Sequence, residues 1–259
     1  MYAELDRLHP PQKADIVLSD IEMPKRAKKS KGKMKGRPIT LEEFERMLAK
    51  VPDVVGERAA DSWTHYLTGL WLSGLRLEES MHLYWDRDDR LLVDFTGKYP
   101  MLHIPAEYQK KHEDQLMPLV PEFVEFLLET PSLDRTGPVF NPLPLRANAP
   151  RLQPHRVGEL ASAIGKAAGV KVFTDPITAK VKYASAHDLR RSFGDRWKTK
   201  VMPHVLKELM RHKNIETTNR YYITENAAST AQLLWDQQAG THIGTHAPEA
   251  SSPTKNALP

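Results

Sequence analysis

The stretch SAHDLRRSFGDRW, residues 185–197, predicts the helix around which the rest of this chain is arranged. Ser185 is a favourable N-cap residue, and Asp188 stands three positions later as its capping-box partner. Leu189 and Phe193 are four residues apart, so they share one face of the helix, and that face is expected to point into the core. The opposite side of the helix is left for polar residues.

Two of those polar residues, His187 and Arg190, are spaced i and i+3 and therefore share a face. They stand beside the N-terminus of the helix, where unpaired N–H groups and the helix dipole favour an anion. A phosphate group suits such a place. A His-x-x-Arg pair is also common on ordinary helix surfaces, so the pair alone does not identify a site.

Apolar spacing predicts further helices on both sides of this one. The first is expected to begin at Thr40, a good N-cap with Glu43 as its capping-box partner. Other helices are expected in AADSWTHYLTGLWL (59–72, with a stop near Gly74), LEESMHLYW (77–85), PEFVEFLLET (121–130), RVGELASAIGKAAGV (156–170) and PHVLKELMR (203–211).

The hydrophobic period changes over residues 91–120. RLLVDF, PMLHIP and QLMPLV are short β-like runs that turn residues and charged loops separate. They predict a small antiparallel sheet inserted near the start of a helical domain. The expected fold class is therefore mainly α with a small antiparallel β-sheet (α+β).

Composition narrows the kinds of protein that this chain can be. The 259 residues include 40 % hydrophobic and 27 % charged residues, as is usual for a globular domain with a real core. The chain has no cysteine, so it has no disulfide, thiolate nucleophile or cysteine metal site, which fits a reducing cytoplasm. No apolar run reaches the roughly 18 residues of a membrane span, and no signal-peptide pattern opens the chain.

Positive charge is concentrated in PKRAKKSKGKMKGR, residues 24–37, within a chain whose net charge is only +4. This block is either a solvated, disordered segment or a mobile arm that attracts phosphates by releasing counterions from DNA or RNA; nuclear targeting is a weaker interpretation. The candidate nucleic-acid contacts in it are Lys25, Arg26, Lys28, Lys29, Lys31, Lys33, Lys35 and Arg37.

The stretch LMRHKNIETTNRYY, residues 209–222, ends in two tyrosines that cannot face the same way. Neighbours on a helix point about 100° apart. If a helix begins after Asn214, Ile215, Thr218 and Tyr222 fall at i, i+3 and i+7 and form a buried stripe. This spacing assigns Tyr222 to packing and leaves Tyr221 available.

Three segments in this order resemble the catalytic domain of the tyrosine recombinases, the phage-integrase family. They are SGLRLEES, HDLRRSF and LMRHKNIETTNRYY, and the resemblance runs from about residue 39 to residue 225. It implies the catalytic-core fold of that family. It also implies site-specific recombination of double-stranded DNA, by a homotetramer that holds two DNA sites.

The resemblance assigns a role to each matching residue. Arg76 and Arg190 match the two arginines that hold the scissile phosphate, since guanidinium forks fit phosphate oxygens in two-point contacts. His187 and His212 are expected to hydrogen-bond the phosphate or to help move a proton. Tyr221 matches the nucleophile, whose product is a 3′-phosphotyrosine ester.

Two supporting roles follow in the same way. Glu79 matches an acid that orients Arg76, unless it is an ordinary surface glutamate. A lysine in a β-hairpin loop acts as general acid in the family, and Lys110 is favoured here over Lys111. The resemblance implies no metal and no cofactor, because arginines stabilise the developing charge; a metal site at His242 and His246 is a remote alternative.

The chain departs from the family pattern in two places. Arg211 stands where glycine is usual, as LMRH in place of LGH, and is expected to be tolerated or to add a phosphate contact. The family usually carries a DNA-clasping domain of on the order of a hundred residues before the catalytic one. Residues 1–38 are too few for it, so the protein is expected to be a short recombinase or to begin inside a longer one.

These observations predict three regions: a basic arm or linker (1–38), a catalytic domain (39–225), and a C-terminal helix with a disordered tail (226–259). AASTAQLLWDQ in the last region is expected to dock on a neighbouring subunit or to pack on its own domain. The expected location is the cytoplasm, with the nucleoid. Two alternative functions stay open: a non-catalytic DNA-binding remnant, and a DNA-relaxing enzyme of the type IB topoisomerase kind.

Overall fold

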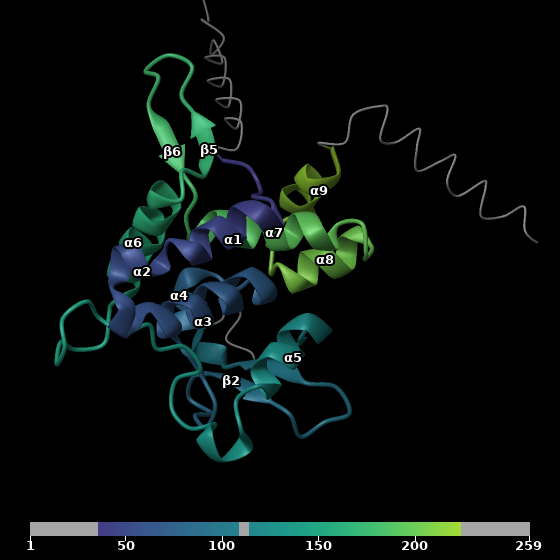
Figure 1. Cartoon of the computed structure of the whole chain (residues 1–259). Helices are drawn as coiled ribbons and strands as arrows, with labels where there is room; N and C mark the ends of the chain where they lie inside the picture. Colours follow the sequence, from purple (N-terminus) through teal and green to yellow (C-terminus); the bar gives the residue numbers. More distant parts are fainter. Residues whose placement is uncertain (1–35, 109–113, 224–259) are drawn as a thin grey trace, which may run out of the picture. The chain divides into compact units, whose positions relative to one another are not determined.

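The computed structural model describes residues 36–108 and 114–223 (Figure 1). The stretch from 1 to 35, Lys110, Lys111 and the helix expected at 227–237 lie outside the described residues. The described part confirms the expected class, a mainly helical fold with a small sheet. None of its helices is long and apolar enough to cross a membrane.

The helices and strands follow one another in the order that the sequence pattern predicts, with some additions. The helices are α1 (Leu41–Ala49), α2 (Val51–Val55), α3 (Glu57–Ser73), α4 (Leu77–Met81), α5 (Pro121–Leu128), α6 (Pro154–Ala167), α7 (Ala186–Trp197), α8 (Pro203–Leu209) and α9 (Ile215–Ile223). The strands are β1 (Leu83–Tyr84), β2 (Leu91–Asp94), β3 (Met101–Ile104), β4 (Gln115–Pro118), β5 (Lys171–Thr174) and β6 (Val181–Tyr183), and two short 3-10 turns, Ala106–Tyr108 and Ser132–Asp134, complete the set.

Local signals begin and end the principal helices. The Thr40 hydroxyl accepts a hydrogen bond from the Glu43 N–H at 3.2 Å, and the Glu43 carboxylate accepts one from the Thr40 N–H at 3.1 Å. Ser185 and Asp188 form the same reciprocal box at the start of α7. Gly74 ends α3 in the left-handed conformation, with φ of 61°. These caps confirm the expected helix starts and the stop at Gly74.

Helix α3 forms the centre of the core. Trp63, Tyr66 and Leu67 are fully buried on it, and α3 packs against α7 on one side and against α2 and α5 on others. Phe44 of α1 stacks on Trp71 of α3, with ring centroids 4.5 Å apart. Because the long helix is buried on several faces, the elements that carry the site are attached to a rigid support.

The larger sheet has the strand order β1-β2-β3-β4. Leu102 pairs with Val93 on one neighbour and with Met117 on the other, in antiparallel register, and all three side chains are buried. Alternation then places the intervening residues of β2 and β3 on the more exposed face. The antiparallel sheet expected over residues 91–120 is therefore confirmed.

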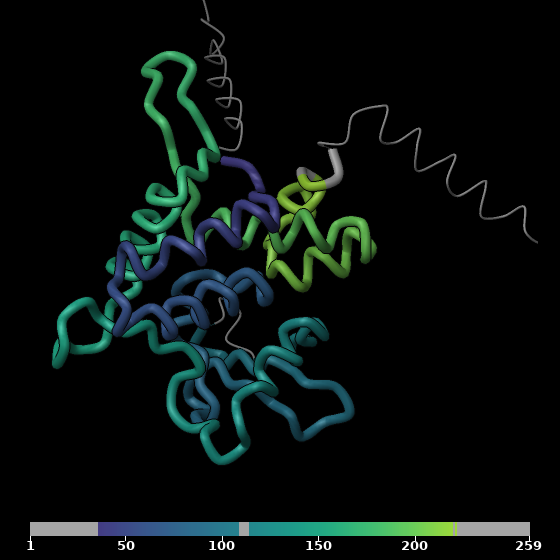
Figure 2. Tube along the Cα trace, in the orientation of Figure 1, coloured from purple at the N-terminus to yellow at the C-terminus, as the bar shows by residue number. Residues whose placement is uncertain are grey.

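Two segments differ from the expectation. The helix expected over 77–85 ends at Met81, and Leu83 and Tyr84 instead form β1, which pairs in parallel with β2. The second difference is the β5–β6 hairpin, which extends beyond α6 (Figure 2) and was not expected. Strands β1 and β6 have only two and three residues, too few to show a clear period, and pairing with a neighbouring strand makes all three segments strands.

Candidate functional site

Arg190, on α7, is held by two backbone carbonyl groups. Its side chain is buried and donates hydrogen bonds to the carbonyl oxygens of Gly74 and Met210. At Gly74 the ring of Phe193 occupies the space where a side chain would stand, so the turn needs glycine for room as well as for its positive φ. Arg190 thereby joins the end of α3 to the end of α8.

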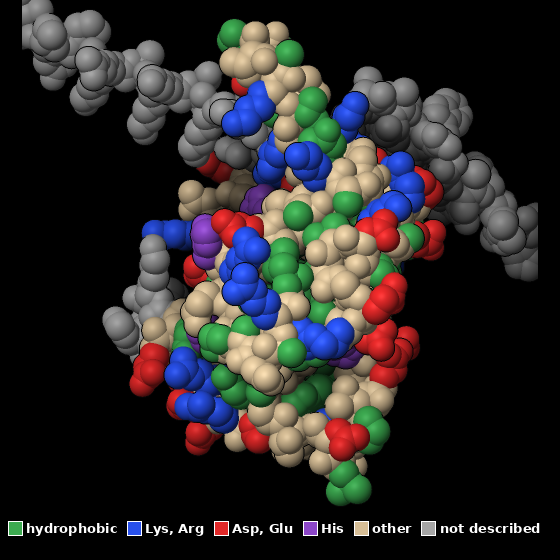
Figure 3. Space-filling model, turned by 60° about the vertical axis from the view of Figure 1, so that its left-hand side comes forward, with side chains coloured by type: hydrophobic (Ala, Val, Ile, Leu, Met, Phe, Trp, Pro, Cys, Tyr) green, Lys and Arg blue, Asp and Glu red, His purple; other side chains and the backbone are tan. Residues whose placement is uncertain are grey.

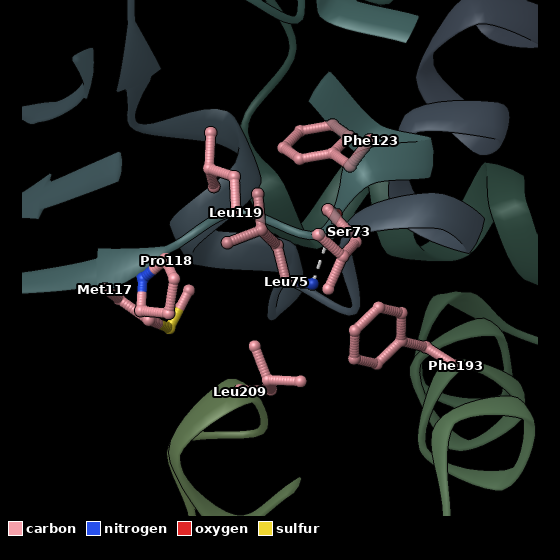
Figure 4. Close-up of a pocket in the computed structure, with 9 residues that line it drawn as sticks. Ser73, Leu75, Met117, Pro118, Leu119, Phe123, Phe193 and Leu209 are labelled. Atoms are coloured by element: carbon pink, nitrogen blue, oxygen red, sulfur yellow. Dashed lines mark hydrogen bonds between the residues drawn. The ribbon is translucent and has the colours of Figure 1, made fainter. Parts of the chain in front are cut away.

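A small apolar cluster packs at the ends of α3 and α8. Leu75, Phe193 and Leu209 point toward one cavity of about 10 Å³, which Met117 and Phe123 also line (Figure 4). A cavity of this size is near the minimum for a single water molecule. This apolar cluster is therefore close-packed and has no room for a ligand. It helps to fix the ends of α3 and α8, to which Arg190 is hydrogen-bonded.

Arg76 stands at the N-cap of α4 and is partly exposed. Its Nη1 donates to the Glu79 carboxylate at 2.6 Å, and its Nη2 donates to the carbonyl oxygen of Arg211 at 2.8 Å. The Arg76 backbone N–H donates to the same carboxylate at 2.7 Å. The side chain remains 46 % exposed, so the guanidinium keeps an open side toward solvent while its inner side is fixed.

Arg211 occupies the other side of the Glu79 carboxylate. Its guanidinium forms an ion pair with Glu79, and its Nη1 contacts the sulfur of Met117 at 3.3 Å. The Arg211 side chain is only 8 % exposed. The expected phosphate contact of Arg211 needs an accessible guanidinium, and the structure places that group inside the protein instead. The backbone of Arg211 is left-handed, with φ of 45°.

The cluster includes two histidines, His187 and His212, from different segments. His187 is exposed in the first turn of α7, and partial desolvation together with Arg191 and Arg190 lowers its pKa. His212 lies in the turn before α9, where its Nδ1 is 2.9 Å from the Thr218 hydroxyl. Burial and the surrounding arginines lower the pKa of His212 to about 4, so its ring is neutral at neutral pH.

Tyr221 is buried, which corrects the expectation that it is turned away from the packed face of α9. Only 8 % of Tyr221 is exposed, and Thr218, one turn earlier, is fully buried. Ile215, expected in the buried stripe, is 40 % exposed. The expected burial of the Tyr222 side chain lies outside what the structure describes. Helix α9 therefore packs through Thr218, as the spacing predicted, and through Tyr221, which the spacing had left available.

Burial does not remove Tyr221 from the cluster. Its ring stacks on that of His212, with centroids 6.0 Å apart and planes 13° from parallel. Its other side meets Gly194 of α7, where an added Cβ would lie 2.8 Å from the ring. Burial raises the pKa of Tyr221, while Arg190 and Arg191 oppose that rise.

The cluster draws together residues that are distant in the sequence. The charges of Arg190, Arg76, Arg211 and His187 all act on the ring of His212, and Arg190 acts on Tyr221. Five of the six residues that the resemblance assigned to catalysis are therefore neighbours: Arg76, His187, Arg190, His212 and Tyr221. The sixth, Lys110, lies outside the described residues.

Arg191 is a member of the cluster that the sequence analysis did not assign. It is buried and forms an ion pair with the buried carboxylate of Asp188. Its charge acts on both His187 and Tyr221. The second arginine in HDLRRS is the feature of the sequence that could have indicated this role. The sequence does not say, however, whether that arginine faces the cluster or points away from it.

Of the residues expected to contact nucleic acid through the basic block, only Arg37 is described. Its guanidinium forms a two-point ion pair with Glu43, at 2.7 and 2.5 Å, and donates to the Lys171 carbonyl at 2.9 Å. Arg37 thus ties the start of the described chain to α1 and β5. Figure 3 shows several Lys and Arg side chains on one face of the molecule. The β5–β6 hairpin contributes Lys171 and Lys182 in its strands and Lys180 in the loop between them.

The chemistry of the cluster follows from its charges. Arg76, Arg190 and Arg211 supply three guanidinium groups, and Glu79 supplies a carboxylate that acts on Arg190. Although burial lowers the pKa of Arg190 to about 9, an arginine stays protonated at neutral pH. The surplus positive charge suits an anion such as a phosphodiester. Within residues 36–108 and 114–223, no group of three His, Asp or Glu side chains could hold a metal ion.

Comparison with protein families gives a match over most of the chain. The model of the phage integrase family matches residues 37–228. Comparison with curated proteins gave no match.

Solved structures with a similar fold include integrases bound to DNA. A fragment of the Tn1549 transposon integrase in complex with transposon right end DNA is 18 % identical, with a TM-score of 0.51 over 79 % of this chain and 66 % of that one. A lambda integrase dimer bound to a COC′ core site is 13 % identical, with a TM-score of 0.50 over 74 % of this chain and 60 % of that one. This chain therefore spans less than two thirds of each of these structures, and at such identities the likeness shows the fold alone.

Proposed function

Because the chain belongs to the phage integrase family, we propose that it breaks and rejoins DNA strands in site-specific recombination, with Tyr221 as the nucleophile. The observation that carries this proposal is the convergence of Arg76, Arg190, His212 and Tyr221 from three separate segments. Arg190 donates to the carbonyl of Met210 and Arg76 to that of Arg211, and the Tyr221 ring stacks on His212. These residues therefore meet beside the exposed side of the Arg76 guanidinium, which supports a common task.

The reaction is a transesterification at phosphorus. The Tyr221 hydroxyl oxygen attacks the scissile phosphate and loses its proton, and the bond from phosphorus to the 5′ oxygen breaks. The products are a 3′-phosphotyrosine ester and a 5′ hydroxyl, which takes up a proton from a general acid, proposed here as Lys110. Because one phosphodiester replaces another, the strand can be rejoined by the reverse reaction without ATP.

The arginines stabilise the charge that this reaction builds. Negative charge grows on the nonbridging oxygens in the transition state, and preorganised guanidinium groups act on it without rearrangement. Arg190 is fixed by two carbonyl groups, and Arg76 is fixed on its inner side, so both are preorganised in this sense.

The protonation states fit these roles. Burial raises the pKa of Tyr221, so the free protein holds it as a neutral phenol. Neutral His212 can accept or donate a hydrogen bond beside it, and exposed His187 can do so from the start of α7. A phosphate held between the arginines then completes the site.

The wider assembly is also a proposal. We infer double-stranded DNA as the partner, a homotetramer on two duplexes as the active form, and association with the nucleoid as the setting. Light scattering of the protein on a duplex tests the assembly, since the proposed form contains four copies and two duplexes, whereas a binding remnant would give particles with a single duplex.

A covalent trapping experiment tests the chemistry. The protein is incubated with nicked duplexes that carry a randomised core, and adducts that resist denaturation are collected and sequenced. Tyr221→Phe is expected to abolish the adduct and Tyr222→Phe to retain it. Both changes keep the aromatic ring and remove only the hydroxyl group. Loss of the adduct only in Tyr222→Phe would reverse the assignment.

The two other functions give different results. DNA retention without an adduct, in the unmodified protein, would identify a DNA-binding remnant. A second assay on supercoiled plasmid identifies a relaxing enzyme, which would form the adduct and relax the plasmid without exchanging strands between two duplexes.

A further inference from the structure

The turn between α8 and α9 carries an arginine in a conformation that favours glycine. Arg211 has φ of 45°, and its N–H donates to the Glu208 carbonyl at 2.8 Å. A left-handed backbone costs a residue with a side chain about 1 kcal/mol relative to glycine. The Arg211 side chain must therefore make interactions that offset this cost.

Those interactions all lead to Glu79 and its surroundings. Arg211 Nε donates to one carboxylate oxygen of Glu79 at 3.2 Å, and its Nη2 donates to the other. The remaining Nη1 lies against the Met117 sulfur on β4. The guanidinium is thus surrounded by protein, and no edge of it is left for a DNA phosphate.

The same carboxylate holds Arg76 from the opposite side. Both Glu79 oxygens accept from Arg76, one from Nη1 and the other from the backbone N–H. The carbonyl of Arg211 accepts from Arg76 Nη2 as well. Arg211 is therefore connected to Arg76 twice, through the carboxylate and through its own backbone.

From this arrangement we propose that Arg211 is a positioning residue, which fixes Glu79 and thereby aims the Arg76 guanidinium at the scissile phosphate without touching DNA. The proposal rests on the proposed function for the identity of that phosphate. It also gives a reason why arginine stands at position 211 in place of the usual glycine: the arginine side chain helps to preorganise Arg76.

Charge supports the arrangement. A lone Glu79 would neutralise Arg76 and weaken its attraction for an anion. With Arg211 added, two cations share one carboxylate, so the group keeps a net charge of +1 at the place where the phosphate binds. Burial raises the pKa of Glu79, but the charges and hydrogen bonds of Arg211 and Arg76 outweigh it and lower that pKa to about 2, which keeps the carboxylate ionised throughout the ordinary pH range.

The test compares Arg211→Met with Arg211→Lys in the full chain. Methionine keeps an unbranched apolar stem and the backbone strain but removes both bonds to Glu79, whereas lysine keeps the charge and can make one bond. A displacement of about 1 Å at a reacting group can cost on the order of a hundredfold in rate. Arg211→Met is expected to slow adduct formation to about that extent and Arg211→Lys to slow it less, while the Kd for the duplex changes less than about threefold.

A matched control separates this effect from a general loss of stability. Arg46→Met makes the same chemical change on α1, where Arg46 is 48 % exposed and pairs with Glu42 at 2.9 Å. It is expected to leave the adduct rate unchanged. The pH profile adds a readout that structure alone does not move: without Arg211 the Glu79 pKa rises, so Arg211→Met is expected to lose rate on acidification at a higher pH than the unmodified protein.

Two results of the rate and binding measurements would overturn the proposal. A parallel fall in rate and DNA affinity, with the salt dependence of binding reduced by about one phosphate contact, would make Arg211 a direct ligand. If Arg211→Met formed the adduct at the unmodified rate and lost rate at the same low pH as the unmodified protein, Arg211 would have no positioning role.

Carbon-13 titration of the Glu79 carboxyl, assigned with Glu79→Gln, keeps this test separate from the proposed function. It needs no adduct: a Glu79 pKa that is the same in Arg211→Met and in the unmodified protein refutes the coupling, whether or not the protein cleaves DNA. Absence of any adduct in the unmodified protein would instead count against the proposed function.

Discussion

Gly194 lies on α7 at the place where the Tyr221 ring packs, and replacing it with alanine is expected to displace the nucleophile. An added Cβ would stand 2.8 Å from Tyr221 Cε1 and 2.9 Å from Cζ. Carbon atoms in ordinary contact are about 3.5–4.0 Å apart. The ring must therefore retreat by roughly 0.7 Å, the difference between 2.8 Å and the lower limit of that range. The nearby methyl group of Met210, at 3.2 Å, can move aside more easily.

The expected effect on stability is smaller than the effect on reactivity. Overpacking a core position costs about 1–3 kcal/mol, and alanine in place of glycine inside a helix returns about 1 kcal/mol. The net change in the free energy of unfolding is thus about 0–2 kcal/mol. A displacement approaching 1 Å at the nucleophile can cost on the order of a hundredfold in rate. Gly194→Ala should then fold and bind DNA, yet form the covalent adduct slowly.

The assay measures adduct formation and thermal unfolding on the same samples. Gly158→Ala on α6 is the control, because its added Cβ would meet only the end of the flexible Leu77 side chain, at 3.3 Å. That variant is expected to gain up to about 1 kcal/mol and to keep its rate. A Gly194→Ala protein with normal melting and an adduct rate within about twofold of the original would show that Tyr221 does not react from this packed position.

Two further changes probe the residues around the nucleophile. Arg190→Lys can donate to only one of the two buried carbonyls, those of Gly74 and Met210. Urea unfolding should therefore show a loss of about 1–3 kcal/mol in the free energy of unfolding, and the adduct should be lost as well. Unaltered stability would contradict the conclusion that these two carbonyls hold Arg190. His212 has a folded pKa of about 4, below the roughly 6.5 of an unfolded histidine, so its contribution to stability is complete above pH 6.5 and is lost as the pH falls toward 4. Urea unfolding between pH 7 and 4.5 should therefore show that the free energy of unfolding depends less on pH in His212→Gln than in the unmodified protein. Glu79 loses its own contribution at lower pH, so it does not obscure this difference.

The local features of this fold could be predicted because neighbouring residues produce them. The two capping boxes and the left-handed turn at Gly74 depend on residues within one turn of each other. Strands β2, β3 and β4 are long enough to show their alternation. Strand β1 and the β5–β6 hairpin were missed because hydrogen bonds to a partner strand, which no local pattern records, decide that they are strands.

The motifs of the sequence were enough to name the candidate residues, since the order and spacing of the arginines, histidines and tyrosine survive without coordinates. Their connections were not contained in the motifs. That Arg211 faces Glu79 and not solvent, and that Arg190 rests on two carbonyls, depends on where α4, α7 and the α8–α9 turn meet.

The sequence alone established the helical phase of residues 215–223 and showed that Tyr221 and Tyr222 point in different directions. It could not establish which direction is inward. Thr218 fits a stripe with either tyrosine, and the choice was made by a gap on another helix, where Gly194 leaves room for the Tyr221 ring. Periodicity is a property of one helix, whereas burial is a property of two surfaces in contact, and only the tertiary structure brings the second surface.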